Sequence, residues 1–218
     1  MVKAAAYNCE ALQDPVIFNQ VYNIISPQRR AHVDEAKNPK TRCERLGATH
    51  LLEKMLWENH LERPYEYTYN ESGRPLLVRP EGMQFSISHS DFLAVCAISD
   101  GPVGIDVERQ RQYDSSMVHR FFTKFDIEFL DGTKEEDQAR KFTEVWTFKE
   151  AVAKMMDRPL MQVLQWVDFD EYCDCSKGEI NWTKQGFEFQ DFYITLCYEQ
   201  KRQPVQMGLY NPFDGKYY

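Results

Sequence analysis

Val103-Gly104-Ile105-Asp106-Val107-Glu108 follows the turn Asp100-Gly101-Pro102 and marks the place where the order of predicted elements begins again. The segment alternates at a period of two, which is typical of a β-strand. Before it the sequence predicts helices and then strands, and after it helices and strands in the same order. This repetition predicts an α+β protein with two similar lobes in one chain, over residues 1–100 and 101–218. In each lobe, we expect helices to pack on a small, mainly antiparallel sheet.

Hydrophobic periodicity and turn residues place the individual elements. In the first lobe they predict a strand near 2–8, helices near 15–25, 27–36 and 40–60, and strands at Tyr65–Tyr69, Phe85–Ser88 and Leu93–Ser99. In the second lobe they predict a strand at Val103–Glu108, helices near 115–121, 124–130 and 135–157, and strands at Val167–Tyr172, Glu179–Thr183 and Phe187–Glu199. The residues after Glu199 match no pattern.

Composition narrows the class of protein. The 218 residues are 43% hydrophobic and 14% aromatic, which is a globular composition. The net charge of −8 argues against binding to nucleic acid or to an anionic membrane. One segment, Arg29–Arg45, is basic, with six basic residues against three acidic ones. Such a segment suits a small anionic ligand, although a solvated helix face would carry the same charges.

The cellular compartment follows from what the sequence lacks. The first residues contain no apolar core of a signal peptide, and no apolar run approaches the ~20 residues that span a bilayer. We therefore expect a cytoplasmic protein. The six cysteines show no paired spacing of the kind that zinc sites have, so we expect reduced thiols.

Two carboxylates share one face of the predicted strand Val103–Glu108. Asp106 and Glu108 lie two residues apart, about 7 Å along the backbone, so they can converge on one hard cation with oxygen ligands. Gly104 lets another backbone or a ligand approach closely. A polar strand edge after a turn would explain the same acidic residues without a metal.

The helix predicted at 135–157 places a charge within its apolar face. That face contains Phe142, Val145, Trp146, Val152, Ala153 and Met156. Lys149 points into its middle, and Glu150 and Lys154 line its edge. A buried ammonium is costly unless an anion or a carboxylate meets it, so we expect this helix to face an internal polar site. Alternatively, Glu150 and Lys154 form only an i,i+4 ion pair on the surface.

Two further segments have side chains that suit phosphate. Ser88-His89 ends the strand that begins at Phe85, where both side chains can donate hydrogen bonds to phosphate oxygens. Gly73-Arg74-Pro75 is a turn with a stiff backbone that presents an arginine. Each segment alone is equally compatible with a structural role. A serine hydrolase is disfavoured because no G-x-S-x-G segment occurs.

Taken in order, these segments resemble the Sfp-type phosphopantetheinyl transferases, over roughly Ser26 to Lys154. The family pattern is G-[IV]-D-x-E followed about forty residues later by W-[ST]-x-K-E-[AS]-x-x-K. This chain has both parts, at Gly104–Glu108 and Trp146–Lys154. The family's S-H and G-[KR]-P segments correspond to Ser88-His89 and Gly73-Arg74-Pro75.

The resemblance implies a pseudo-dimeric fold and a reaction that transfers phosphopantetheine from coenzyme A to a serine of a carrier protein. It implies that Asp106, Glu108 and Glu150 hold Mg²⁺, with Mn²⁺ as an alternative. Glu150 would also help to deprotonate the serine, and Lys154 and His89 would act on the phosphates as further catalytic residues. The residues expected to contact coenzyme A are Arg29, Arg42, Arg74, Ser88, His89, Lys149 and Lys154. The family's arginine before Gly47 has two candidates here, because Arg45 fits almost as well as Arg42.

The resemblance also implies partners. We expect coenzyme A in a cleft between the lobes, an acyl or peptidyl carrier protein as the acceptor, and a monomer. Neither nucleic acid nor membrane is expected. Two alternatives remain at this point: a Mg²⁺-dependent hydrolase of the coenzyme A pyrophosphate, and a module that binds coenzyme A or the carrier without turnover.

Overall fold

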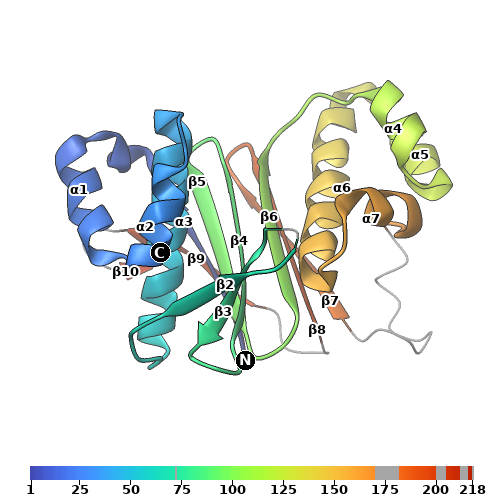
Figure 1. The fold of residues 1–218 in the computed structure, drawn as a ribbon. Helices are drawn as coiled ribbons and strands as arrows, with labels where there is room; N and C mark the ends of the chain where they lie inside the picture. Colours follow the sequence, from blue (N-terminus) through green and yellow to red (C-terminus); the bar gives the residue numbers. More distant parts are fainter. Residues whose placement is uncertain (72, 170–181, 200–204, 212–215, 218) are drawn as a thin grey trace. The chain divides into compact units, whose positions relative to one another are not determined.

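The structure is a computed structural model that describes residues 1–71, 73–169, 182–199, 205–211 and 216–217. The chain divides into two compact units (Figure 1). The first unit comprises Met1–Gly101 and Val205–Tyr218, and the second comprises Pro102–Pro204. The predicted division near residue 100 therefore agrees with the structure. The assignment of the whole of 101–218 to the second lobe was wrong, because the C-terminal segment returns to the first unit.

The first unit carries all the described helices and strands that precede Gly101, together with two strands from the C-terminal segment. Its elements are β1 (Val2–Asn8), the 3₁₀ helix η1 (Glu10–Gln13), α1 (Pro15–Ile24), α2 (Pro27–Asp34), α3 (Pro39–Glu58), β2 (Glu66–Tyr69), β3 (Pro75–Arg79), β4 (Gln84–Ser90), β5 (Leu93–Ser99), β9 (Met207–Asn211) and β10 (Lys216–Tyr217). Five strands form a sheet in the order β10-β9-β1-β5-β4, and β2 pairs with β3. All pairs are antiparallel except β1 with β9, which is parallel.

The long helix α3 packs on the sheet of the first unit. Its N-terminus is set by Asn38, whose side chain accepts a hydrogen bond from the backbone N–H of Lys40, and by Pro39 in the first turn. The helix lies on β5, every residue of which is buried (Figure 1). At Gly47 the approach is so close that an added Cβ would lie 2.1 Å from the Sγ atom of Cys9. Leu46, Leu51 and Leu52 fill the core beneath the helix.

The second unit has the same type of construction. Its elements are β6 (Val103–Arg109), α4 (Ser115–Phe121), α5 (Lys124–Asp131), α6 (Glu135–Met156), α7 (Leu160–Trp166), β7 (Trp182–Phe189) and β8 (Phe192–Glu199). The strands form an antiparallel sheet in the order β6-β8-β7. The long helix α6 lies on β6 and β8 (Figure 1) and packs against a separate core that includes Phe142, Phe148 and Val152. The α+β prediction, with helices on small and mainly antiparallel sheets, is confirmed.

Several predicted elements differ from those observed. The strand predicted at Phe187–Glu199 is a hairpin, since β7 and β8 are joined at Gln190 and Asp191, and Gln190 has a positive φ of 55°. Residues 167–169 of the strand predicted at Val167–Tyr172 are not in a strand, and they follow α7, which the sequence did not predict. The remaining residues of that strand, and all but the end of the one at Glu179–Thr183, lie outside the described residues. The short strand β3 was also missed.

Four of the six cysteines lie in the described part of the chain. Cys9, Cys43, Cys96 and Cys197 are buried and not in disulfides, as expected for reduced thiols. Cys173 and Cys175 lie outside the described residues. Among the helices that the structure describes, none combines the length and the apolar character that a bilayer span requires.

Candidate active site

Close packing of α6 on β6 assembles the acidic residues of the second unit. A Cβ atom added to Gly104 would lie 1.9 Å from the carbonyl oxygen of Ala151 and 2.6 Å from the backbone nitrogen of Met155. No side chain fits there, so glycine lets the helix backbone touch the strand. The close approach predicted at Gly104 is therefore that of another backbone. It brings the C-terminal half of α6, with Glu150 and Lys154, to the strand that carries Asp106.

Asp106 and Lys154 form a contact across this strand and helix. Asp106 is 4% exposed, and its Oδ1 atom lies 2.7 Å from the Nζ atom of Lys154. The same Nζ atom lies 3.3 Å from the carbonyl oxygen of Ile105. Lys154 therefore bonds to β6 in this structure. The simple i,i+4 surface pair with Glu150 does not describe its environment.

Glu150 lies in the field of its acidic neighbours. Burial raises the pKa of Glu150, and the negative charges of Asp106 and Glu108 raise it further, against the opposing charges of Lys154 and Arg111. The two carboxylates that raise the pKa of Glu150 are those of the other two predicted metal ligands. A carboxyl group with a raised pKa accepts a proton more readily than an ordinary surface glutamate.

Glu108 is held by an arginine that the sequence analysis did not single out. The Nη1 atom of Arg111 lies 3.5 Å from Oε1 of Glu108, and its guanidinium lies 4.5 Å from the centre of the Trp146 ring. The backbone N–H of Arg111 donates to the hydroxyl of Thr143 on α6, at 2.8 Å. Arg111 is thus a cation fixed beside the acidic residues. The only signal in the sequence was an arginine three residues after Glu108, since Trp146 lies 35 positions later.

The acidic residues of the second unit match a Mg²⁺ site in type but not in spacing. In the described part of the chain, no group of three or more histidine, cysteine, aspartate or glutamate side chains has the spacing of metal ligands. Asp106 and Glu108 instead contact Lys154 and Arg111. The donor set is nevertheless of the right type, because Mg²⁺ is bound through carboxylate oxygens, and a divalent cation would offset the repulsion that raises the pKa of Glu150. The residues fit Mg²⁺ in chemistry, without being preassembled around it.

Lys149 lies in the interior of the second unit, away from any surface. Its side chain has no exposed area, and its ammonium donates to Oδ2 of Asp126, which is also fully buried, and to the carbonyl oxygen of Val167. Burial lowers the pKa of Lys149, and the Asp126 carboxylate opposes that shift. The prediction that a carboxylate meets this charge agrees with the structure. The expected contact with coenzyme A does not, because no part of the ammonium is available to a ligand.

Ser88 and His89 lie on β4 in the first unit, and both side chains are partly exposed. The Nδ1 atom of His89 lies 3.3 Å from Oε2 of Glu44, a residue of α3 that is only 5% exposed. Burial opposes ionisation of Glu44, but hydrogen bonds from His89 and from the backbone N–H of Phe92 lower its pKa overall. The predicted phosphate residue His89 thus has a buried acidic partner that the sequence analysis missed.

The four arginines considered in the sequence occupy different environments. Arg29 is 1% exposed. Its Nε atom lies 3.3 Å from the Thr49 hydroxyl, and its guanidinium lies over the Tyr67 ring. Its buried Nη1 atom has no hydrogen-bond partner. Arg74 follows Gly73, whose φ is +80°, and its Nη2 atom lies 3.4 Å from the carbonyl oxygen of Phe85. Both are therefore directed toward the protein in this structure.

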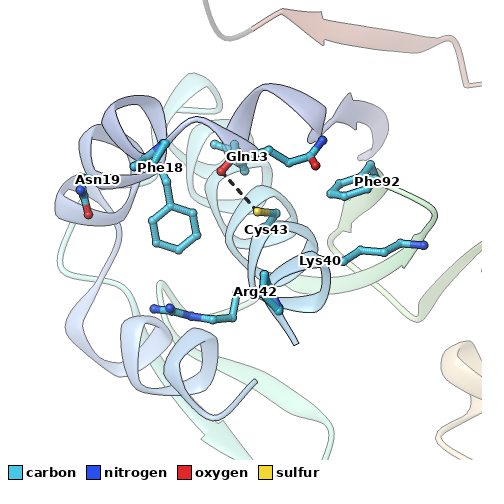
Figure 2. A pocket seen from close by; sticks show the side chains of 10 residues that line it. Gln13, Phe18, Asn19, Lys40, Arg42, Cys43 and Phe92 are labelled. Carbon is cyan, nitrogen blue, oxygen red and sulfur yellow. Dashed lines mark hydrogen bonds between the residues drawn. The ribbon is translucent and has the colours of Figure 1, made fainter. Parts of the chain in front are cut away.

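Arg42 and Arg45 lie one turn apart on α3, and both contact residues of α2. Arg42 contacts Asp34 at 3.0 Å and the Phe18 ring, and it lines a pocket of about 480 Å³ with Cys43 and Phe92 (Figure 2). Arg45 donates to the carbonyl oxygen of His32 at 2.8 Å. Figure 2 shows the Cys43 thiol directed at η1, where it bonds to the carbonyl oxygen of Leu12 at 3.3 Å.

Comparison with known proteins agrees with these motifs. Residues 102–207 match the family model of the 4′-phosphopantetheinyl transferase superfamily. The chain is 31% identical over 160 residues to the 4′-phosphopantetheinyl transferase gsp of Aneurinibacillus migulanus, which covers 71% of this chain and 66% of that protein. It is 27% identical over 117 residues to the 4′-phosphopantetheinyl transferase Sfp of Bacillus subtilis, covering 50% and 52%. A third relative is the 4′-phosphopantetheinyl transferase AcpT of Salmonella typhimurium, at 28% over 120 residues, covering 54% and 62%.

These matches, together with the β6 and α6 motifs, identify the class of protein. The chain belongs to the 4′-phosphopantetheinyl transferase superfamily. The matched regions span between about half and two thirds of the length of these relatives, at 52%, 62% and 66%.

Proposed function

We propose that this protein transfers the phosphopantetheine arm of coenzyme A to a serine of an acyl or peptidyl carrier protein, with Mg²⁺ as the metal. The apo carrier becomes the holo carrier, and adenosine 3′,5′-bisphosphate is released. The proposal is supported by the family to which the chain belongs and by its motif residues, which are all present.

One feature of the second unit carries this proposal. Gly104 lets α6 touch β6, and the contact brings Glu150 and Lys154 to Asp106. Several carboxylates and a lysine in one place are what a pyrophosphate with a bound divalent cation requires. A surface strand and a surface helix would not bury Asp106 to 4% exposure beside a lysine.

The reaction assigns a task to each of these side chains. The serine oxygen attacks the β-phosphorus of coenzyme A, and the bond from that phosphorus to the oxygen of the adenosine bisphosphate breaks. Mg²⁺ held by Asp106, Glu108 and Glu150 would neutralise charge on the pyrophosphate. Glu150 accepts the serine proton, directly or through a water molecule. Lys154, now bonded to Asp106, would turn to the leaving phosphate and offset the charge that develops there.

Residues of the first unit have the complementary task of binding the nucleotide. His89 and Ser88 lie partly exposed on β4, as phosphate contacts must. Arg42, or Arg45 in its place, would serve the nucleotide from α3. Arg29 and Arg74 would need to leave the protein contacts that they make in this structure. We place the reaction in the cytoplasm and expect the chain to act as a monomer.

Mass spectrometry of a carrier protein tests the proposal. Purified apo acyl carrier protein is incubated with this protein, coenzyme A and Mg²⁺, and we expect the carrier to gain the mass of one phosphopantetheine. The gain should vanish when Mg²⁺ is chelated and in Asp106→Asn, but persist in the matched control Asp137→Asn, a surface residue of α6 that is 45% exposed. Transfer by Asp106→Asn at saturating Mg²⁺ would reject the metal assignment.

Two other outcomes would reject the transferase itself. Cleavage of coenzyme A without a carrier protein would identify a hydrolase. Binding of coenzyme A without any product, across acyl and peptidyl carriers, would identify a binding module.

A further inference from the structure

Glu44 links three parts of the first unit through one carboxylate. It lies on α3 and is 5% exposed. Its Oε2 atom lies 3.3 Å from Nδ1 of His89 on β4, and its Oε1 atom accepts a hydrogen bond from the backbone N–H of Phe92 at 3.0 Å. Both oxygens therefore hold the hairpin that joins β4 to β5. Burying a carboxylate costs free energy unless its oxygens are paired. The two contacts of Glu44 therefore indicate its role in the protein.

The hairpin that Glu44 holds has an unusual turn. Ser90 pairs with Leu93, so Asp91 and Phe92 alone form the loop, with positive φ values of 46° and 64°. Two-residue turns of this kind favour asparagine and glycine, and a phenylalanine at positive φ is strained. The strain persists only because the surroundings impose it, and such positions cluster at functional sites.

The surroundings of this turn converge from several elements. The backbone N–H of Cys9 donates to the carbonyl oxygen of Phe92 at 2.6 Å. Lys40 of α3 pairs with Asp91 and lies 5.5 Å from the centre of the Phe92 ring (Figure 2). With Glu44 at the Phe92 N–H, the loop is fixed on both its backbone and its side chains. The position of His89, two residues before the loop, is fixed with it.

The chemistry of the contact determines how His89 is presented. The hydrogen bonds that Glu44 accepts lower its pKa, so at neutral pH the carboxylate is ionised and can only accept. The Nδ1 atom of His89 must then carry a proton, whether the ring is neutral or charged. This leaves Nε2, at the far edge of a side chain that is 32% exposed, as the ring nitrogen that meets a ligand.

We infer that Glu44 is a positioning residue, which fixes the ring orientation and the Nδ1–H form of His89 so that Nε2 faces the phosphate of coenzyme A. The inference rests on the proposed function for the identity of the phosphate. It adds a residue outside the motifs that identify the superfamily. In an alternative role, Glu44 only holds the turn in place through the Phe92 N–H. That role predicts the same fold but no effect of Glu44 on coenzyme A binding that depends on His89.

The tautomer of His89 can be measured without any assay of activity. Nitrogen-15 spectra of the histidine side chains, with the His89 signals assigned by their loss in His89→Gln, distinguish Nδ1–H from Nε2–H. We expect Nδ1 to be protonated in the wild-type protein, and Glu44→Gln to shift the ring toward the Nε2–H form that free histidine prefers. A wild-type ring with the proton on Nε2 alone would overturn the inference, whatever the variants do.

A double-mutant cycle tests whether Glu44 acts through His89. Binding of coenzyme A is measured by calorimetry for wild type, Glu44→Gln, His89→Ala and the double variant. We expect Glu44→Gln to weaken binding about tenfold, as for the loss of one hydrogen bond to a charged group. In the His89→Ala background, the same change should weaken binding less than twofold. Equal effects in both backgrounds would show that Glu44 does not work through His89.

A matched control is available in the same unit. Glu35 lies 3.3 Å from Nδ1 of His32 in the same manner, but it is 69% exposed. Glu35→Gln should leave the His89 spectrum unchanged. Failure of the wild-type protein to bind coenzyme A, despite an Nδ1–H ring, would refute the proposed function and with it the phosphate role of His89. Normal binding with no effect of Glu44→Gln would refute this inference alone.

Discussion

Replacement of Lys149 by methionine removes one charge from the interior of the second unit and leaves the other. Methionine has nearly the same length and is apolar, so it fits among Phe122, Phe148 and the other side chains of this core. The Asp126 carboxylate would remain, with no exposed surface, and would retain only its hydrogen bonds from the Thr123 hydroxyl and the Phe169 N–H, both at 2.9 Å. The carbonyl oxygen of Val167 would also lose its donor.

The size of the effect follows from these contacts. Removal of one partner of a buried ion pair costs about 3–5 kcal/mol, because it leaves an uncompensated buried charge. We expect Lys149→Met to lower the free energy of unfolding by this amount. Lys149→Met combined with Asp126→Leu should recover part of the loss, since no charge is then buried. The recovery should be incomplete, because Asp126 also bonds Thr123 and Phe169.

Urea denaturation followed by tryptophan fluorescence measures this free energy. Three of the four tryptophans, Trp146, Trp166 and Trp182, belong to the second unit, so the signal reports mainly on the unit that is changed. The matched control is Lys141→Met on the same helix, where the lysine is 28% exposed and lies 2.8 Å from Glu144. A pair of that kind contributes about 0–1 kcal/mol.

Two results would refute the reasoning. A loss for Lys149→Met no larger than that for Lys141→Met would mean that the buried ion pair contributes little. A folded, stable Lys149→Met protein with weakened coenzyme A binding would mean that Lys149 contacts the ligand, as the resemblance to the family implied.

Two further predictions concern packing and pH. Gly104→Ala should destabilise the protein by about 1–3 kcal/mol, toward the upper end because the added Cβ meets backbone at 1.9 Å. Gly186→Ala on β7, where an added Cβ has no atom within 4 Å, should have little effect on stability. Equal urea midpoints for the two variants would contradict the close contact of α6 with β6. Burial lowers the pKa of His50 to about 4, so the folded protein favours the neutral ring. The resulting contribution to the free energy of unfolding is complete above pH 6.5 and should be lost as the pH falls to about 4. The loss should reach up to about 3 kcal/mol. Between pH 7 and pH 4.5, the urea midpoint should fall less in His50→Gln than in the wild-type protein. An equal fall of the midpoint in both proteins would exclude His50 as the cause.

The sequence alone determined the type of the long helices and of several strands, and the place of the main motifs. The helices α3 and α6 and the strand β6 are visible because their residue types repeat with a regular period. In β6 this period does not mark a single buried side, since Val103–Val107 are all buried. Gly104 was recognisable as a point of close approach, because only glycine admits a backbone at that distance. The need for an anion beside Lys149 was also readable, since a charge cannot lie unpaired in an apolar face. These inferences depend on neighbours within one element.

The tertiary structure alone decided which groups meet. Nothing in the sequence pairs Lys149 with Asp126 on another helix, or Glu44 with His89 on a strand 45 positions later, because such contacts depend on how elements pack and not on any period. The C-terminal segment illustrates the same limit. Its residues Met207–Asn211 have no strong pattern, yet they add a parallel strand beside β1, because the edge of that sheet offers unpaired backbone groups. The periodicity of a sequence records which side of an element is buried, and the fold alone determines the partner that buries it.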